Sequence, residues 1–339
     1  MRKLLNTLYI TREQAWLTLD GNNIVCKLED EEDEKFRIPF DNVENIVCFS
    51  YLGCSPALMG KCAENLIPIS FVSPQGKFLA RVTGNTRGNV VLRVDQIDCF
   101  REHGLLLAQN TIAAKLANTV ALIRRSQHDK PELRADEEIQ NTLDALKQGI
   151  SAVYAAADTD EVMGVEGNCA HRYFSVFGKL LSGDATFELR TKRPPLDPVN
   201  AVLSFVYTLY TNEYAAALET VGLDSYIGYC HALRSGRDSL ACDLLEEARC
   251  IAERFTLTLF NLRVLTDQDF DAKPTGAVWL NDDGRKKLLT QWQEKKRTEL
   301  QHPYLNQKIQ LGLLPYVQSN LLAKYIRGDI PEYPSYLQK

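Results

Sequence analysis

The sequence predicts an α+β protein in which a small β-rich N-terminal domain (residues 1–90) precedes a larger all-helical C-terminal domain (residues 91–339). Two observations carry this prediction. Before residue 83, apolar and β-branched residues alternate or cluster in short runs separated by turn residues. From residue 105 onward, apolar residues instead recur every three or four positions over long segments, as they do on one face of a helix. The glycine-bearing stretch Thr83–Asn89 marks the change, and we place a linker at residues 84–92.

Short β-rich runs predict the strands of the N-terminal domain, at residues 8–10, 16–19, 24–26, 36–40, 45–49, 67–72 and 76–81. Asp20–Asn23 supplies the turn of a hairpin. Ser55 followed by Pro56 predicts the cap and first turn of one short helix, over Ser55–Asn65. The acidic run Glu29–Glu34 predicts a solvated turn rather than a metal site, because nothing spaces its carboxylates inward.

The C-terminal part predicts a series of helices, at residues 105–125, 137–157, 167–182, 197–218, 284–300 and 305–326. Two further helices are expected between 224 and 260. The run YIGYCHALR ends at Ser235-Gly236, where glycine takes left-handed backbone angles at little cost. Asp238 or Ser239 then caps a long amphipathic helix that begins at Leu240.

The composition predicts a globular, cytoplasmic protein without a membrane segment. The chain has 339 residues, 45% of them hydrophobic, and a formal net charge of −5, which gives no overall basic footprint for nucleic-acid binding. Nine cysteines are scattered without a CxxC pair, which favours a reducing compartment over a disulfide framework. No apolar run approaches the roughly 18 residues of a membrane span, and the opening MRKLLNTLYI is too short for a signal sequence.

Four residues stand out as candidates for chemistry. His231 lies close in sequence to Asp243 and Glu246, and these two acids share a helix face because they are three residues apart. The break at Ser235-Gly236 allows the imidazole and the carboxylates to converge. Glu166 lies between Gly164 and Gly167 at the entrance of a predicted helix. Plainer interpretations stay open: a helix cap for Glu166, an ordinary buried or surface histidine for His231, and a solvated helix face for the two acids.

The combination of imidazole and carboxylates suits Mg²⁺ or Mn²⁺, and Mn²⁺ is the better match to imidazole. Such an ion can polarise a phosphoryl oxygen during phosphoryl transfer. The sequence has no G-x-S-x-G elbow, no Walker loop and no H-E-x-x-H motif. Other familiar nucleophile and phosphate-binding sites are therefore not indicated.

Two blocks contain these residues, GVEGNCAHRYF (164–174) and GLDSYIGYCHALRSGRDSLACDLLEEAR (222–249), and a third block, RPPLDPVNAVLSFVYTLY (193–210), lies between them. Together with LYITREQAWLTLDG (8–21) and LAQNTIAAKLANTVALIRR (107–125), they resemble, in order and over nearly the whole chain, the catalytic subunit of the CRISPR spacer-acquisition complex. Details of the blocks are similar to the lineage that accompanies type I-C systems.

The resemblance implies a metal-dependent DNA endonuclease and integrase. In that family, the 3′-hydroxyl of a captured foreign fragment attacks a phosphodiester at the repeat end of the CRISPR array. Carried over by motif, Glu166, His231 and Asp243 hold the divalent ion, and Glu246 and Arg249 match the acid and the arginine that follow. Because these two lie one helical turn apart, we expect a supporting ion pair between them, and a direct metal contact by Glu246 is the alternative. The implied partners are double-stranded DNA, a second copy of the chain in a homodimer, a dimer of the small second adaptation protein, and an end-trimming nuclease.

Basic residues in three places are candidate DNA contacts: Arg190, Lys192 and Arg193 before a proline corner, Arg234 and Arg237 around Gly236, and Arg285, Lys286 and Lys287 in the strongest local basic patch. For each, a solvated or internally paired side chain is the alternative. Two other functions also stay open: a general structure-selective repair nuclease that uses the same ion, and a non-catalytic DNA-binding scaffold. The product of the reaction separates the first from an integrase, and metal titration separates the second.

Overall fold

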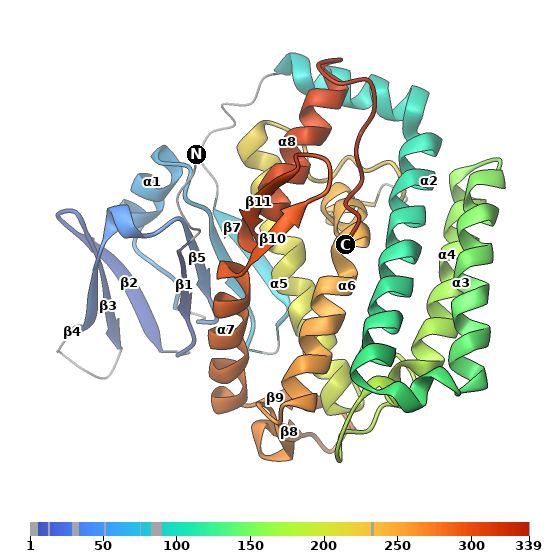
Figure 1. Cartoon of the computed structure of the whole chain (residues 1–339). Helices are drawn as coiled ribbons and strands as arrows, with labels where there is room; N and C mark the ends of the chain where they lie inside the picture. Colours follow the sequence, from blue (N-terminus) through green and yellow to red (C-terminus); the bar gives the residue numbers. More distant parts are fainter. Residues whose placement is uncertain are drawn as a thin grey trace.

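The computed structural model describes residues 6–12, 14–28, 34–50, 52–74, 76–82, 90–231 and 234–338. Strands β1–β7 gather at one end of the molecule and helices make up most of the remainder (Figure 1). The predicted fold class is confirmed, since a β-rich N-terminal region precedes a mostly helical C-terminal part. Most of the predicted linker at residues 84–92, and nearly all of the acidic run Glu29–Glu34, lie outside the described residues.

Two sheets form the N-terminal region. An antiparallel sheet has the order β2-β3-β4, and a second sheet has the order β1-β5-β6-β7, in which β7 alone is antiparallel to its neighbour. The bounds are β1 Thr7–Ile10, β2 Ala15–Asp20, β3 Asn23–Leu28, β4 Glu34–Pro39, β5 Asn45–Cys48, β6 Ile69–Val72 and β7 Phe78–Val82. Helix α1 (Pro56–Glu64) connects β5 to β6 and begins as predicted, with the Ser55 side chain accepting a hydrogen bond from the Leu58 N–H.

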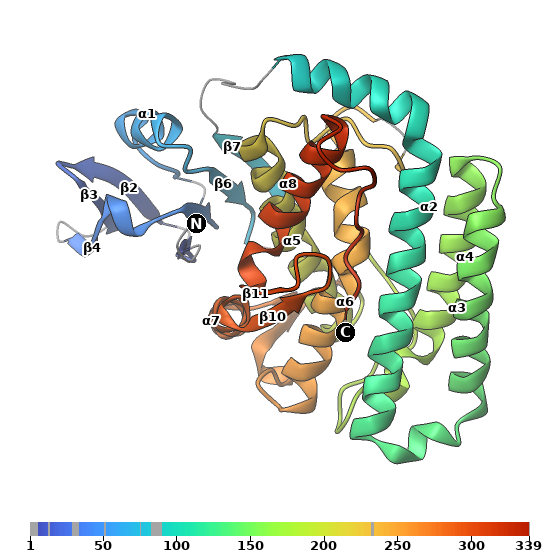
Figure 2. The ribbon, with the colours of Figure 1, turned by 45° about the horizontal axis from the view of Figure 1, so that its top comes forward.

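The helical part contains α2 (Val90–Asp129), α3 (Glu137–Ala155), α4 (Thr159–Phe177), α5 (Pro198–Val221), α6 (Ser239–Asn261), α7 (Asp282–Arg297) and α8 (Leu314–Ile326). It also contains two small hairpins, β8 (Phe270–Ala272) with β9 (Val278–Leu280) and β10 (Glu299–His302) with β11 (Gln307–Gln310). In both views α5 and α6 lie in the middle (Figures 1 and 2). Helices α3 and α4 lie together on the outer side of α2 at one edge, and the sheets formed by β1–β7 lie at the opposite edge.

Several predicted elements differ from the structure. The predicted helix at 305–326 is instead the end of a hairpin followed by α8, because Pro315 takes a first-turn position and the chain before it pairs as β10 and β11. The hairpins also correct the all-helical description of the C-terminal part. The predicted helix at 105–125 is the middle of a longer helix, α2, which begins at Val90. Its first turns expose Val90, Val91 and Val94, so the apolar periodicity was weak there.

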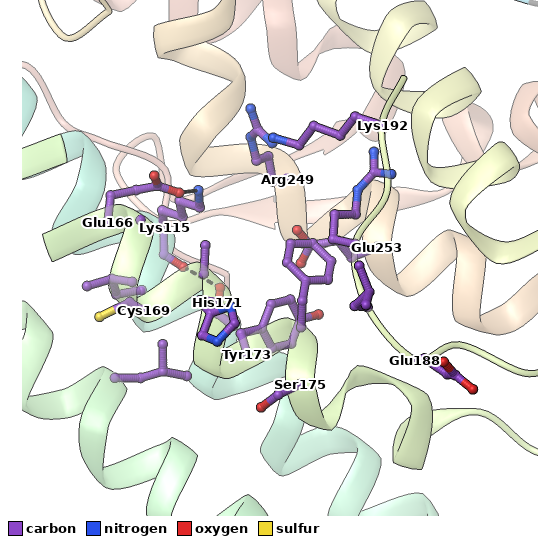
Figure 3. A pocket seen from close by; sticks show the side chains of 18 residues that line it. Lys115, Glu166, Cys169, His171, Tyr173, Ser175, Glu188, Lys192, Arg249 and Glu253 are labelled. Atoms are coloured by element: carbon purple, nitrogen blue, oxygen red, sulfur yellow. Dashed lines mark hydrogen bonds and ion pairs between the residues drawn. The ribbon is translucent and has the colours of Figure 1, made fainter. Parts of the chain in front are cut away.

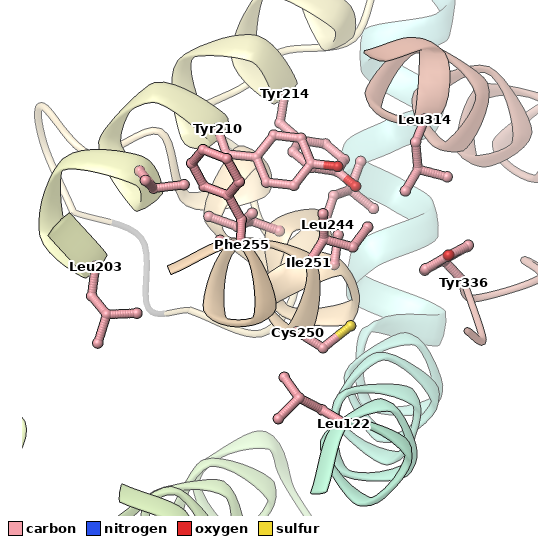
Figure 4. Packing of buried hydrophobic residues seen from close by; sticks show 14 of the residues in the cluster. Leu122, Leu203, Tyr210, Tyr214, Leu244, Cys250, Ile251, Phe255, Leu314 and Tyr336 are labelled. Atoms are coloured by element: carbon pink, nitrogen blue, oxygen red, sulfur yellow. The ribbon is translucent and has the colours of Figure 1, made fainter. Parts of the chain in front are cut away.

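The main hydrophobic core lies between α2, α5, α6 and α8. Figure 4 shows Tyr210 and Tyr214 of α5 above Phe255 and Leu244 of α6, with Tyr336 of the C-terminal segment closing one side. The four-stranded sheet contributes to this core as well. Phe49, for example, stacks on Phe205 of α5, with 5.6 Å between ring centroids. Helix α2 has the length and hydropathy of a membrane span, but 72% of that window is buried inside the protein, which is typical of a core helix.

Three buried cations join the N-terminal sheets to the helices. Arg81 of β7 pairs with Glu219 of α5 at 2.8 Å. Lys296 of α7 donates to the Tyr9 hydroxyl of β1 at 3.3 Å and pairs with Glu213 of α5 at 2.8 Å. Arg285 of α7 donates to the Pro74 carbonyl at 2.8 Å and is 1% exposed. The prediction that Arg285 contacts DNA is therefore wrong in this structure: its guanidinium holds the two parts of the chain together, because the sheet covers this face of α7.

A C-terminal segment, residues 331–338, runs back along α6 and α2 (Figures 1 and 2). Its anchor is Glu247, a fully buried acid of α6 that accepts hydrogen bonds from the Tyr333 hydroxyl (2.6 Å), the Tyr336 N–H (2.9 Å) and the Gln318 side chain (2.8 Å). Asn118 of α2 donates to the Tyr336 carbonyl at 2.8 Å. These contacts fix the segment against the helix that carries Asp243 and Glu246.

His302 extends this network, and its buried environment makes the stability of the protein depend on pH. Burial lowers the pKa of His302, although its bond to Gln318 opposes this. Its Nε2 lies 2.9 Å from Gln318 Oε1, and its Nδ1 accepts the Leu305 N–H at 3.2 Å, so a proton on Nδ1 would face another donor. The unfolded chain, with a histidine pKa of about 6.5, therefore binds more protons below that pH.

We expect the contribution of His302 to the free energy of unfolding to fall as the pH drops below about 6.5, and we expect His302→Gln, which does not titrate, to lose that part of the pH dependence. Glu247, whose pKa burial raises to about 7, contributes with the opposite sign in both proteins. Urea unfolding of both proteins between pH 7.5 and 5.5 measures the effect. Parallel pH profiles for the two proteins would show that His302 contributes nothing to it.

Candidate active site

His231 lies on an irregular loop between α5 and α6, not at the end of the predicted helix. Gly222, with φ +92°, ends α5, and the buried Gln96 of α2 then holds the loop. The Gln96 amide donates to the carbonyls of Asp224 and Ile227, both at 3.0 Å, and accepts the Asp224 N–H at 2.9 Å. A side chain 128 residues away thus takes up the backbone groups that a helix would have paired internally.

Asp243 is buried in the first turns of α6, with both carboxylate oxygens occupied. Oδ2 accepts the N–H groups of Tyr229 (2.7 Å) and Cys230 (3.0 Å). Oδ1 accepts the His231 N–H at 3.0 Å and lies 2.6 Å from His231 Nδ1. Gly228 makes this approach possible, because a Cβ there would lie 2.5 Å from Asp243 Oδ2. Asp243 therefore orients the imidazole from behind and leaves Nε2 free to face another group.

Glu246, one turn further along α6, lies on the Nε2 side of that imidazole. Its Oε1 is 3.7 Å from His231 Nε2 and 2.7 Å from Arg249 Nη2, and its Oε2 is 2.7 Å from Lys115 Nζ. Burial alone would raise the pKa of Glu246, but Arg249, Lys115 and His231 together lower it to about 2. The predicted ion pair with Arg249 is confirmed. The alternative that Asp243 and Glu246 lie on a solvated helix face is wrong, since Asp243 is 0% exposed and Glu246 is 2% exposed.

Glu166 lies in the interior of α4, not at a helix entrance. Helix α4 starts earlier than predicted because Asp158 accepts the Glu161 N–H as its cap, so Gly164 and Gly167 are helical residues. The capping interpretation of Glu166 is wrong for the same reason. Its Oε1 makes a short ion pair with the ammonium group of Lys115. The carboxylate therefore points from α4 toward α2 and α6, and toward Glu246.

Lys115 is the residue that our interpretation of the sequence missed. It is a buried lysine of α2, 8% exposed, that ion-pairs with both Glu166 and Glu246. The sequence does contain an indication of this role. Lys115 interrupts the apolar run IAAKLA, and its neighbours Ile112 and Leu116 on the same helix face are core residues. A charged residue at such a position needs a buried partner.

A cavity of about 530 Å³ opens beside these residues. Lys115, Glu166 and Arg249 line it together with Lys192 and Glu253, and aromatic side chains of α4 form part of its wall. Figure 3 shows the Lys115 ammonium against the Glu166 carboxylate, with Arg249 and Lys192 on the opposite side. The cavity therefore combines carboxylates with the cationic groups of Arg249, which pairs with Glu246, and Lys192, and cationic groups in such a cavity suit a phosphate ester.

The donor set fits a divalent cation. Two carboxylates and an imidazole nitrogen are ligands that Mn²⁺ accepts, and an ammonium ion already stands between the two carboxylates. Within the described ranges, no three histidine, cysteine or acidic side chains are close enough to hold a metal as they stand. Lys115 stands between Glu166 and Glu246 in this arrangement.

The remaining predicted DNA contacts differ in how they are placed. Lys192, Arg193, Arg234 and Lys286 are exposed, and Arg237 is partly buried. Lys287 is exposed but pairs with Asp269 at 2.6 Å. Arg190 is used internally, because its guanidinium donates to Asn200 Oδ1 at 2.7 Å and to Ser204 Oγ at 3.0 Å. Arg190 and Lys192 both line the cavity beside Glu166, and of these two Lys192 is the exposed one.

Residues 8–294 match the family model described as CRISPR associated protein Cas1. The chain is 39% identical over 343 residues to CRISPR-associated endonuclease Cas1 1 of Chlorobaculum tepidum, covering 99% of each protein. It is 41% identical over 347 residues to CRISPR-associated endonuclease Cas1 2 of Rhodospirillum rubrum, covering 100% of each. A fusion of a Cas4 exonuclease with a Cas1 endonuclease from Geobacter sulfurreducens is 31% identical, over 98% of this chain and 60% of the fusion.

Solved structures share the fold at lower identity. A casposase bound to integration product superposes with a TM-score of 0.85 at 19% identity, over 98% of this chain and 92% of that one. A Cas1 protein from Thermotoga maritima gives 0.81 at 24% identity, over 95% and 97%. A chain of a Cas6-RT-Cas1–Cas2 complex gives 0.83 at 21% identity, over 100% of this chain and 37% of that one.

Proposed function

The chain belongs to the Cas1 family of CRISPR-associated proteins, and from this premise we propose that it is a metal-dependent DNA endonuclease and integrase of spacer acquisition. One observation supports the proposal most: Glu166 of α4 and Glu246 of α6 both contact one buried cation, Lys115, which lines a cavity together with Glu166. His231, from a third segment, faces Glu246. A scaffold that only bound DNA would not need to bury this charge.

We propose Glu166, His231 and Glu246 as the metal ligands, which exchanges the roles that the sequence prediction gave to Asp243 and Glu246. Both oxygens of Asp243 are occupied, and its bond to Nδ1 is the one by which a carboxylate orients a metal-binding histidine. Nε2 is left facing Glu246 at 3.7 Å. Glu246 is ionised at neutral pH because nearby cations hold its pKa at about 2.

A bound Mg²⁺ or Mn²⁺ would neutralise the charge that builds on the phosphoryl oxygens of the attacked phosphodiester. The chain's own residues supply positioning and further charge. Arg249 and Lys192 line the cavity beside Glu166, where they bind phosphate oxygens of the DNA. Asp243 keeps the imidazole of His231 in one orientation throughout.

Joining then proceeds by exchange of phosphodiester bonds. The 3′-oxygen of the captured fragment bonds to a phosphorus atom of the repeat strand, the bond from that phosphorus to the neighbouring sugar oxygen breaks, and the proton lost by the 3′-hydroxyl balances the one gained by the leaving oxygen. Water in place of the hydroxyl gives hydrolysis at the same centre, so one site accounts for both activities.

We propose that double-stranded DNA, both the foreign fragment and the CRISPR repeat, is the substrate and that Cas2 is the small second protein. The Cas1–Cas2 complex among the matches supports Cas2, and the Cas4–Cas1 fusion supports an end-trimming nuclease as a further partner. A homodimer, the type I-C lineage and a cytoplasmic location are also part of the proposal.

The test is strand transfer of a short duplex into a plasmid that carries a repeat array, with and without Cas2 and Mn²⁺. We expect joined products only when both are present. Nicked plasmid without joined fragment would instead indicate a general nuclease, and no metal-dependent product of either kind would indicate a scaffold.

A further inference from the structure

Lys115 occupies an unusual position for a lysine. It extends from the buried face of α2, on which both α4 and α6 pack, and its ammonium contacts Glu166 Oε1 of α4 and Glu246 Oε2 of α6 at once. The side chains of Lys115 and Glu246 are 10% and 2% exposed, so bulk water screens this charge poorly.

The two carboxylates need a cation between them. Like charges held close together in a buried place raise each other's cost of ionisation, and leaving one of them unpaired is strongly destabilising. Although burial opposes it, Glu246 and Glu166 raise the pKa of Lys115, so the lysine stays charged. Arg249 also pairs with Glu246, but through Oε1, the oxygen that Lys115 does not contact.

We propose that Lys115 is the internal cation of the site, which holds Glu166 and Glu246 in place in the metal-free protein and competes with a divalent metal ion for the same two carboxylates. The proposal rests on the ligand set proposed above. The adjoining cavity of about 530 Å³, which Lys115 lines, gives the displaced ammonium room to turn. In that position it joins Arg249 and Lys192 on the side where a phosphate would lie.

Competition makes a prediction that can be measured without DNA. In the full-length protein, Lys115→Gln removes the competitor, so we expect the Kd for Mn²⁺ by calorimetry to fall by about tenfold or more. The same variant leaves two carboxylates facing each other without that cation. We therefore expect its Tm without metal to fall below that of the wild type, and Mn²⁺ to raise its Tm by more than it raises the wild-type value.

Lys192→Gln is the matched control. It removes the same charge from the same cavity, but Lys192 has no ion pair with Glu166 or Glu246 in the described part of the chain. We expect its Kd for Mn²⁺ to change by less than about threefold, through long-range electrostatics alone. A Lys192→Gln effect as large as that of Lys115→Gln would overturn the proposal.

Lys115→Arg keeps the test decisive if the glutamine variant does not fold. Its planar guanidinium can bond both carboxylates with several N–H groups and is harder to displace. We expect a weaker Kd for Mn²⁺ than in the wild type, the opposite sign to Lys115→Gln. Unchanged Mn²⁺ affinity in a folded Lys115 variant would overturn the proposal.

Failure of the inference can be told apart from failure of the proposed function. If the wild type binds Mn²⁺ and Glu166→Gln does not, the proposed metal site stands and the Lys115 variants alone decide the inference. If Glu166→Gln and Glu246→Gln bind Mn²⁺ as tightly as the wild type, or none of them binds it, the proposed site falls and the inference falls with it.

Discussion

Replacing Glu246 by Gln is expected to lower the rate of strand transfer by at least about 1000-fold, equivalent to about 4 kcal/mol of activation free energy, and excess Mn²⁺ should not restore it. The reason is that Glu246 faces His231 Nε2 and shares Lys115 with Glu166, so the substitution removes one of the proposed metal ligands. The measurement is the rate of joining over a wide range of Mn²⁺ concentrations, with unfolding curves to confirm that the variant is folded.

Asp243→Asn should behave differently. Asp243 acts through the imidazole, and loss of such a supporting carboxylate weakens metal binding by about 10- to 100-fold. Excess Mn²⁺ should therefore restore much of the activity of the folded fraction. Both oxygens of Asp243 accept backbone N–H groups, so the NH₂ group of an asparagine would place a donor against a donor. This variant is therefore expected to lose about 1 to 3 kcal/mol of stability. Rescue of Glu246→Gln but not of Asp243→Asn would restore the assignment predicted from the sequence.

Glu253→Gln is a control for both variants. Glu253 lies two turns beyond Glu246 on the same helix, is equally buried and also lines the cavity. It accepts a hydrogen bond from the Tyr207 hydroxyl at 2.8 Å, and burial raises its pKa although Tyr207 opposes this. A glutamine oxygen can accept the same bond. We expect strand transfer to stay within about tenfold of the wild type, so that a loss specific to Glu246 cannot come from removing a buried acid of α6 as such.

The largest loss of stability is expected at Glu247. Substitution by Ala leaves the Tyr333 hydroxyl and the Tyr336 N–H without their acceptor in the protein interior and removes one of the acceptors of the Gln318 amide. We expect the free energy of unfolding to fall by about 3 to 5 kcal/mol, measured by urea unfolding, and residues 331–338 to become sensitive to protease before the helices do.

Tyr333→Phe is the matched variant for that experiment. It removes one of the three donors and leaves the carboxylate paired with the other two, so a loss of about 1 kcal/mol is expected. If Glu247→Ala were as stable as the wild type, or if the C-terminal segment resisted protease equally in both proteins, the segment would not be held by Glu247.

Local sequence pattern was sufficient to predict several elements. The cap at Ser55-Pro56, the turn at Asp20–Asn23 and the helix at Asp197-Pro198 each depend on residues within a few positions of one another, and each lies where it was predicted. The loop that carries His231 could not be predicted in this way. Its conformation depends on Gln96, more than 120 residues earlier. The Gln96 amide makes hydrogen bonds with loop backbone groups that would otherwise pair with each other in a helix.

The four candidate residues Glu166, His231, Asp243 and Glu246 were all identified from the sequence, but their arrangement was not. Helical spacing places Asp243 and Glu246 on one face and cannot tell which nitrogen of His231 each one meets. Lys115 was missed because its partners are 51 and 131 residues away. Arg285 was misjudged because a basic cluster on α7 gives no sign that a sheet covers one side of it.

The sequence by itself determined the order of a β-rich and a helical part, the family, and the side chains available for chemistry, because periodicity, caps and motifs are properties of neighbouring residues. Only the tertiary structure decided that Asp243 supports the imidazole, that Glu246 faces its other nitrogen, and that Lys115 stands between Glu246 and Glu166. Those relations are electrostatic contacts between α2, α4, α6 and a loop, and they arise only when packing excludes water and brings distant charges within bonding distance.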